Sequence, residues 1–171
     1  MSGTHLAMGT SKKWTLRCLL QPGDLGYITS LHGTLYADEC GYDRTFEAYV
    51  AAGLAEFVQS FNPSCDRLWL AEVDGQVIGS IAIVGRSESE AQLRWFIIHP
   101  NYRSLGLGQT LLTEALYFCR EHKYKVVFLW TTGELSAARH LYKQAGFNKT
   151  EERRRNIWGK FVTEERYELH L

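Results

Sequence analysis

The sequence has little of what marks a membrane, secreted or nucleic-acid-binding protein. Among its 171 residues no apolar run approaches the roughly 18 of a membrane span, and the N-terminus lacks the apolar stretch of a signal peptide. Lysine plus arginine equals aspartate plus glutamate at 19 each, so no net positive field attracts nucleic acid or an anionic membrane. We therefore expect a soluble, cytoplasmic protein without a membrane or nucleic-acid partner.

Paired cysteines are also missing. Cys18, Cys40, Cys65 and Cys119 are scattered, with no CxxC motif and no histidines at the spacing of a zinc site. The pattern favours reduced thiols over a disulfide and predicts no metal site.

Apolar residues, by contrast, are plentiful enough for one sizeable core. The chain is 45% hydrophobic, and a domain of this length buries about 70% of its unfolded surface. The opening MSGTHLAMGTS is patternless, and no repeat or low-complexity linker follows. We expect residues 1–11 to be a tag-like or flexible segment and residues 12–171 to be a single domain.

Hydrophobic periodicity predicts an α/β domain. Helical spacing is found at 24–35, 43–61, 107–119 and 136–145. Strand-like runs are found at 14–20, 68–73, 77–85, 92–100 and 126–130, with two more strands in the tail. Asp24, Asp43 and Ser136 stand where they can cap helices. Arg153-Arg154-Arg155 fits a solvated hairpin turn, with a grip on an acidic substrate or the cofactor's 3′-phosphate as the alternative.

The stretch NYRSLGLGQT, residues 101–110, joins an apolar strand-like run to a helix. The first backbone N–H groups of a helix have no partner within it, and Gly106 and Gly108 allow a ligand to approach closely. No Lys-Ser or Lys-Thr follows, as in a P-loop, and Leu111 stands where the dinucleotide fingerprint needs a third glycine. By itself the loop fits either an anion site or a simple turn.

Three linked segments, LRWFIIHPNYRSLGLGQTLLTEAL, VVFLWTT and SAARHLYKQAGF, resemble the GNAT superfamily of acyl-CoA-dependent N-acyltransferases. The resemblance implies a mixed, mostly antiparallel twisted sheet of about seven strands with about four helices. Two parallel central strands, LRWFII and VVFLW, would splay apart to admit acetyl-CoA. The ending IWGKFVTEERYELHL is similar to the acetyltransferase half of MarR-type regulator fusion proteins.

The same resemblance implies acetyl-CoA as co-substrate. Its pantetheine arm would pair with the backbone of 96–98, and its pyrophosphate would lie on backbone N–H groups of 105–110, with Arg103 adding charge or pinning the loop. The implied cofactor-binding residues are Phe96, Ile97, Ile98, Arg103, Ser104, Leu105, Gly106, Leu107, Gly108, Gln109 and Thr110.

Tyr142 matches the family's leaving-group tyrosine. Full proton transfer from a phenol to a thiolate is uphill by roughly 2 kcal/mol, so a hydrogen bond to the departing sulfur suffices. A core aromatic at helical spacing is the alternative interpretation. Where many relatives carry a carboxylate base, this chain has Gln92, which leaves Glu90 or a chain of waters. An exposed hairpin carboxylate is the alternative for Glu90.

Acceptor specificity in the superfamily depends largely on the first two helices, where His32, Tyr36 and Glu39 are the candidate substrate-binding residues. Helix capping and solvation are the alternatives for the carboxylates of this segment. We predict an acetyl-CoA-dependent N-acetyltransferase in which a primary amine of a small molecule or protein attacks the thioester directly. The alternative is an acyl-CoA-sensing regulatory module without turnover. A homodimer is compatible with the aromatic tail, which a core strand explains equally well.

Overall fold

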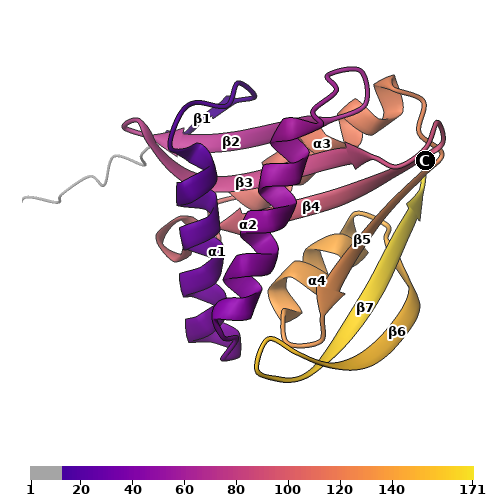
Figure 1. Ribbon diagram of the computed structural model, residues 1–171. Helices are drawn as coiled ribbons and strands as arrows, with labels where there is room; N and C mark the ends of the chain where they lie inside the picture. Colours follow the sequence, from indigo (N-terminus) through magenta and orange to yellow (C-terminus); the bar gives the residue numbers. More distant parts are fainter. Residues whose placement is uncertain (1–12) are drawn as a thin grey trace, which may run out of the picture.

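Seven strands form one mixed sheet in the order β1-β2-β3-β4-β5-β7-β6 (Figure 1). The computed structural model describes residues 13–171, so the segment 1–11 lies outside the described residues. The strands are β1 (Thr15–Arg17), β2 (Arg67–Val73), β3 (Gln76–Gly85), β4 (Glu90–Ile98), β5 (Val126–Thr132), β6 (Asn148–Ile157) and β7 (Lys160–His170).

Helices cover both faces of the sheet. They are α1 (Asp24–Cys40), α2 (Arg44–Gln59), α3 (Leu107–Glu121) and α4 (Ser136–Gln144), with a short 3-10 turn at Pro100–Tyr102. The apolar residues of α1 and α2 pack in one core, and those of α3 and α4 pack in the other. Each amphipathic helix thus buries its apolar face against the sheet. Within residues 13–171 no helix combines the length and apolarity needed to cross a membrane.

The strands β4 and β5 are parallel neighbours that separate soon after they start. Their register covers only residues 90–92 of β4 against 126–128 of β5, whereas β5 pairs with β7 along its full length. Figure 1 shows the two strands diverging toward their arrowheads. The expected mixed sheet with one splayed parallel pair is therefore confirmed.

A bulge in β4 contributes to this opening. Trp95 has a left-handed backbone with φ 47°, and the register with β3 shifts between Ser80 and Ala82. Trp95 packs in the core of α1 and α2, although Leu93, two residues earlier, packs in the core of α3 and α4. Because a regular strand would place both on one face, the bulge turns the end of β4 relative to its start.

Some expected element boundaries were wrong. Helix α1 continues through the polar run to Cys40, where Gly41, with φ 70°, ends it in a left-handed cap. Asp43 does cap α2, since its side chain accepts from Thr45 N. Asp24 and Ser136, however, are the first helical residues, and neither helix has a side-chain cap bond at its N-cap position.

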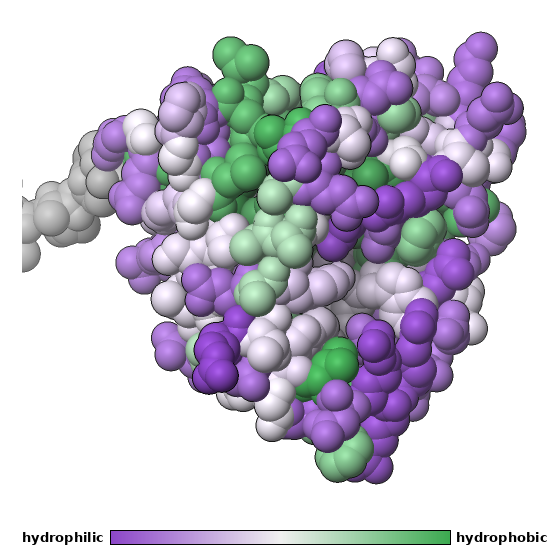
Figure 2. Space-filling model, viewed as in Figure 1, coloured by the Kyte–Doolittle hydropathy of each residue, from purple (hydrophilic) through white to green (hydrophobic). Residues whose placement is uncertain are grey.

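The tail forms the expected hairpin, but its turn is not at the arginines. Residues 153–155 lie inside β6, and the turn is at Trp158 and Gly159, both with positive φ. All of β6 up to Asn156 is exposed, and Figure 2 shows hydrophilic residues over this part of the molecule. Charged side chains on such an edge strand disfavour pairing with another sheet edge.

Candidate active site

Two pockets meet at the opening between β4 and β5. The first, which we call the loop-side groove, is bordered by the end of β4, residues of the 103–109 loop and α4. The second, which we call the aromatic pocket, is bordered by α1, α2, β4, β5 and residues of the tail. Both are lined by Tyr36, Phe96, Leu135 and Ala138. A molecule in the groove and another in the pocket would therefore approach each other at this shared wall.

The loop before α3 presents backbone donors to the loop-side groove. Gly106, with φ 83°, is the N-cap of α3, and no side chain caps the helix there. The N–H groups of Leu107, Gly108 and Gln109 open the helix and have no partner four residues back. Their dipoles and the helix axis favour an anion at this end of α3.

Thr110 was expected to offer its N–H group to the anion, but this group is already bonded. Its N–H donates to Gly106 O at 3.0 Å, and its hydroxyl donates to the same oxygen at 3.1 Å. Thr110 is the first residue of α3 whose N–H has an intrahelical acceptor, so it has no free donor for a phosphate. The free backbone donors of the helix therefore end at Gln109.

Most of the other predicted cofactor residues line the loop-side groove, with Leu105 and Leu107 as exceptions. Leu107 is buried in the core, and Leu105 is exposed on the loop. A Cβ on Gly108 would lie 3.0 Å from Ile98 Cδ1, so a glycine lets α3 begin close to β4. Those that line the groove are Phe96, Ile97, Ile98, Arg103, Ser104, Gly106, Gly108 and Gln109.

Arg103 ties the loop to its surroundings. Its Nε donates to Ile98 O at 3.1 Å, and its Nη1 lies 2.7 Å from Glu39 Oε1. Both side chains are about 40% exposed, so the pair stabilises the fold by at most about 1 kcal/mol. Glu39 was expected to contact an acceptor, but it faces the loop-side groove and pairs with Arg103, away from the aromatic pocket.

Tyr142 lies on α4 and lines the aromatic pocket, next to Phe96, which lines both pockets. Its side chain is 5% exposed, and its ring packs 6.0 Å from Phe96 and 5.8 Å from Phe147 between centroids. Within the described part of the chain its hydroxyl makes no hydrogen bond, and burial raises the pKa of the phenol well above its usual value. The hydroxyl therefore stays protonated and is free to donate to a bound molecule.

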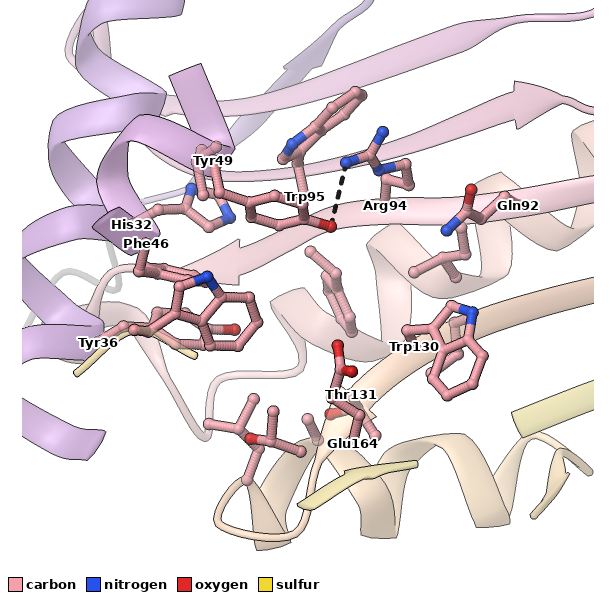
Figure 3. A pocket seen from close by; sticks show the side chains of 18 of the residues that line it. His32, Tyr36, Phe46, Tyr49, Gln92, Arg94, Trp95, Trp130, Thr131 and Glu164 are labelled. Carbon is pink, nitrogen blue, oxygen red and sulfur yellow. Dashed lines mark hydrogen bonds between the residues drawn. The ribbon is translucent and has the colours of Figure 1, made fainter. Parts of the chain in front are cut away.

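The aromatic pocket brings together rings from segments far apart in the sequence (Figure 3). Ring centroids of Tyr36 and Phe46 are 4.5 Å apart, and Trp158 of the β6–β7 turn lies 4.9 Å from Phe46. Aromatic rings provide a large apolar surface for a ligand, and the O–H of tyrosine and the N–H of tryptophan add a few hydrogen-bond donors. The aromatic residues of the lining are Tyr36, Phe46, Tyr49, Trp95, Phe96, Trp130, Tyr142 and Trp158.

His32 supplies a neutral nitrogen to the aromatic pocket. Its Nδ1 lies 2.8 Å from Ile28 O, and because a carbonyl only accepts, the proton resides on Nδ1. The residue is 3% exposed, and burial lowers its pKa to about 4. At neutral pH the Nε2 atom of His32 is therefore a hydrogen-bond acceptor.

The carboxylate of the aromatic pocket comes from Glu164 on β7, which the sequence analysis missed. Its Oε2 lies 3.3 Å from Arg155 Nη1, and its backbone pairs with Thr132 of β5. Only the register of the tail hairpin could have placed it there. Glu90 lines neither pocket, and its carboxylate lies 4.0 Å from Arg166 Nη2. Its role as the base stays a prediction.

Comparisons with known proteins point to one family. The model of the Acetyltransferase (GNAT) family matches residues 34–147. An N-acetylaspartate synthetase of Xenopus tropicalis is 34% identical over 80 residues, which are 46% of this chain and 30% of that protein. N-acetyltransferase family 8 member 2 of Rattus norvegicus is 31% identical over 104 residues, 58% of this chain and 46% of that protein.

The match thus spans 30% of the length of the first relative and 46% of the length of the second. Among solved structures, a GNAT family acetyltransferase from Elizabethkingia anophelis with acetyl-CoA bound has a TM-score of 0.67 at 15% identity. The match covers 92% of this chain and 98% of that one, which shows a shared fold.

Proposed function

Because the chain belongs to the Acetyltransferase (GNAT) family, we propose that it transfers the acetyl group of acetyl-CoA to a primary amine. One observation carries the proposal. The protonated hydroxyl of Tyr142 has no hydrogen-bond partner among residues 13–171, and its side chain lines the aromatic pocket and packs against Phe96, which also lines the groove with the anion-binding donors. Residues 12–171 would act as a single acetyltransferase domain.

The loop-side groove suits acetyl-CoA by its shape and its donors. The N–H groups of residues 107–109 would hold the pyrophosphate. Beyond Gln92 no strand of residues 13–171 pairs with the side of β4 that faces β5, so backbone groups of 96–98 would pair with the pantetheine arm. These contacts involve the main chain, which is why apolar side chains such as Leu105 are tolerated in the loop.

The amine would enter from the aromatic pocket and attack the thioester carbonyl. A C–N bond forms, the C–S bond breaks, and the Tyr142 hydroxyl donates a hydrogen bond to the departing sulfur. His32 Nε2 and the Glu164 carboxylate are the groups lining the pocket that could accept the amine proton. Glu90 lies outside both pockets and could act only through water.

The experiment is thiol release from acetyl-CoA across a panel of primary amines, combined with calorimetric binding of acetyl-CoA. An acetyltransferase releases thiol only when a suitable acceptor is present. An acyl-CoA sensor, the alternative from another functional class, would bind acetyl-CoA tightly without acceptor-dependent release. A protein that neither binds acetyl-CoA nor releases thiol would contradict both proposals.

The relation of the tail to MarR-type fusion proteins and the homodimer are further proposals. Trp158 supports a role of the tail in the acceptor site, since its ring packs against Phe46 of α2. Phe161, 63% exposed on β7, supports a contact with a second copy. Sedimentation of the purified chain would test the homodimer.

A further inference from the structure

Arg94 on β4 is a cation in the wall of the aromatic pocket. Its guanidinium lies 4.3 Å from the ring centroid of Trp95 and 5.9 Å from that of Tyr49. Its Nη2 donates to Tyr49 Oη at 3.4 Å, the dashed line in Figure 3. No carboxylate of residues 13–171 forms an ion pair with it. The aromatic rings hold the guanidinium in place, and its remaining N–H groups can donate to a planar anion such as a carboxylate.

The bulge of β4 creates this stack. Consecutive residues of a regular strand point to opposite faces, but the positive φ of Trp95 turns its ring toward α2. Arg94 points toward α2 as well, since its Nη2 would lie 3.0 Å from a Cβ on Gly53. The local backbone therefore holds the guanidinium against the indole.

Gly53 leaves room for that arrangement. It lies within α2, where glycine is less favourable than alanine. A Cβ there would approach the guanidinium at 3.0 Å and Trp95 Cζ2 at 3.3 Å. The helix thus has its least bulky residue at the point where Arg94 and Trp95 approach it.

A second arginine lies close to Arg94. Arg86 lies nearby and donates through Nε and Nη2 to Gln92 Oε1, at 2.9 and 2.7 Å. Burial, and after it the charge of Arg94, lowers the pKa of Arg86. The carboxylate that lines the pocket, Glu164, is already paired with Arg155. In the lining of the aromatic pocket, Arg94 is therefore the cation that can bind an anionic group.

We propose that the acceptor is an amine that also bears a carboxylate, and that Arg94 binds this carboxylate. The inference rests on the acetyltransferase activity proposed above and names its substrate class. The aromatic lining suits an apolar body between the two polar groups, as in an aromatic amino acid. Gly53 is a positioning residue, since it acts through the guanidinium.

The test compares acceptors that differ in one group. Thiol release from acetyl-CoA would be measured with L-phenylalanine, L-phenylalaninamide and phenethylamine, and with the same three forms of other amino acids. We expect kcat/KM about 10- to 100-fold higher for acids than for their amides, the range of a charge-assisted pair. Arg94→Gln should abolish this preference through a higher KM for the acids, so that acids and amides then have similar kcat/KM.

Two further variants sharpen the test. Arg67→Gln is the matched control, since Arg67 is stacked on Phe118 at 4.7 Å and lines neither pocket, and it should keep the preference. Gly53→Ala should raise KM for the acids several-fold without lowering the thermal midpoint. A purely structural role of Gly53 would change the midpoint and leave the preference for acids intact.

The outcomes separate this inference from the proposed function. Equal rates with acids and amides, or an equal loss for all acceptors in Arg94→Gln, would overturn the carboxylate site while leaving acetyltransferase activity standing. If no amine gives thiol release, the activity fails, and the site is tested by tryptophan fluorescence with N-acetyl-L-phenylalanine. A saturable response to this acid but not to its amide, lost in Arg94→Gln, supports the site, and identical responses refute it.

Discussion

Tyr142 differs from an ordinary core aromatic in its hydroxyl. Its ring packs against Phe96 and Phe147, as a core tyrosine would, yet the described residues give its hydroxyl no partner. The hydroxyl is not one of the fully buried atoms without a partner, so it is accessible from the aromatic pocket and can donate to a molecule bound there. The helical spacing of Ala138, Leu141 and Tyr142 could not distinguish these two roles, because both place the ring on the same face.

Replacing Tyr142 by phenylalanine tests the leaving-group role. The ring contacts remain, but the donor to the departing sulfur is lost, so kcat should fall about 100-fold. The affinity for acetyl-CoA should stay within about two-fold, because the contacts expected for the cofactor are to other residues. Thiol release at saturating acceptor and calorimetric titration of acetyl-CoA measure the two quantities.

Tyr117→Phe is the control for that substitution, since Tyr117 is 61% exposed on α3 and far from the shared wall of the pockets. It should leave kcat unchanged. Unchanged turnover in Tyr142→Phe would mean that Tyr142 has no catalytic role and only packs in the core.

His32 should make stability depend on pH. Its pKa, lowered by burial to about 4 in the folded chain, stays near 6.5 in the unfolded chain. As pH falls below 6.5 the unfolded state takes up the proton first, so stability falls until the folded state also protonates near pH 4. The loss approaches about 3 kcal/mol over this window. Urea unfolding of the protein and of His32→Asn at several pH values measures it.

The His32→Asn variant should not show this loss of stability between pH 6.5 and 4, even if it is less stable than the wild-type chain at neutral pH. His122→Asn is the matched control, because His122 Nδ1 also bonds the carbonyl four residues back, at 2.9 Å, but its ring is only half-buried. Equal pH profiles for the wild-type chain and His32→Asn would mean that the buried imidazole does not titrate as proposed.

Among the elements, the start of α3 depends on a backbone conformation that suits glycine. Gly106 has φ 83°, a conformation that costs an L-residue roughly 1 to 2 kcal/mol. No atom within 4 Å would obstruct an added Cβ, so only the backbone is affected. The local sequence predicted both the turn and the helix, because Gly106 and Gly108 stand directly before an amphipathic repeat.

Gly106→Ala should weaken acetyl-CoA binding about 10-fold, since relief of the strain would rotate the first N–H groups of α3 away from the groove. Gly75→Ala is the control: Gly75 has φ 77° in the β2–β3 turn, again with open space around it. Both variants should lose about 1 kcal/mol of stability, but only Gly106→Ala should lose affinity. Calorimetry and thermal unfolding separate the two effects, and equal acetyl-CoA affinity in both variants would contradict the proposed phosphate site.

Helix ends were predicted less well than helix existence. Asp24 does not cap α1, because its carboxylate binds the guanidinium of Arg17 at 2.7 Å and accepts from Gln21 N. A partner in the strand before the helix is not indicated by helical spacing. The polar run through Cys40 looked like a loop, yet its polar residues form the outer face of α1, and Gly41 was the true stop signal.

For the whole molecule, the resemblance of three sequence segments to the GNAT superfamily implied the sheet and its splay, which the structure confirms. The aromatic pocket depends on contacts across the fold. Trp158 reaches Phe46 only through the hairpin turn of the tail, and Glu164 enters through the register of β7 with β5. The orientation of Arg94 follows from a bulge in β4, and the alternation of side chains expected along LRWFII does not predict this bulge. Hydrophobic periodicity predicts which face of a helix or strand is buried. The positions of these pocket residues depend instead on how the strands pair in the folded sheet.

Because β4 and β5 separate, we expect acetyl-CoA to increase the thermal stability of the fold. Only residues 90–92 of β4 pair with β5, so the two parts of the sheet separate around the groove, and acetyl-CoA would contact both. A ligand that binds only the folded state at 100 times its Kd adds about 2.7 kcal/mol of stability. For a chain of this size that raises Tm by about 5 to 10 °C. Thermal unfolding followed by circular dichroism measures the shift.

Hydrogen exchange would show where this stabilisation arises. Amides of residues 96–98 whose N–H groups face the groove should exchange more slowly with acetyl-CoA, because the pantetheine arm would cover the unpaired side of β4. ATP is the control ligand, since it carries phosphates without a pantetheine arm and should protect the start of α3 at most. Equal protection of 96–98 by ATP would mean that the groove is a general anion site, and the splayed strands would then need another explanation.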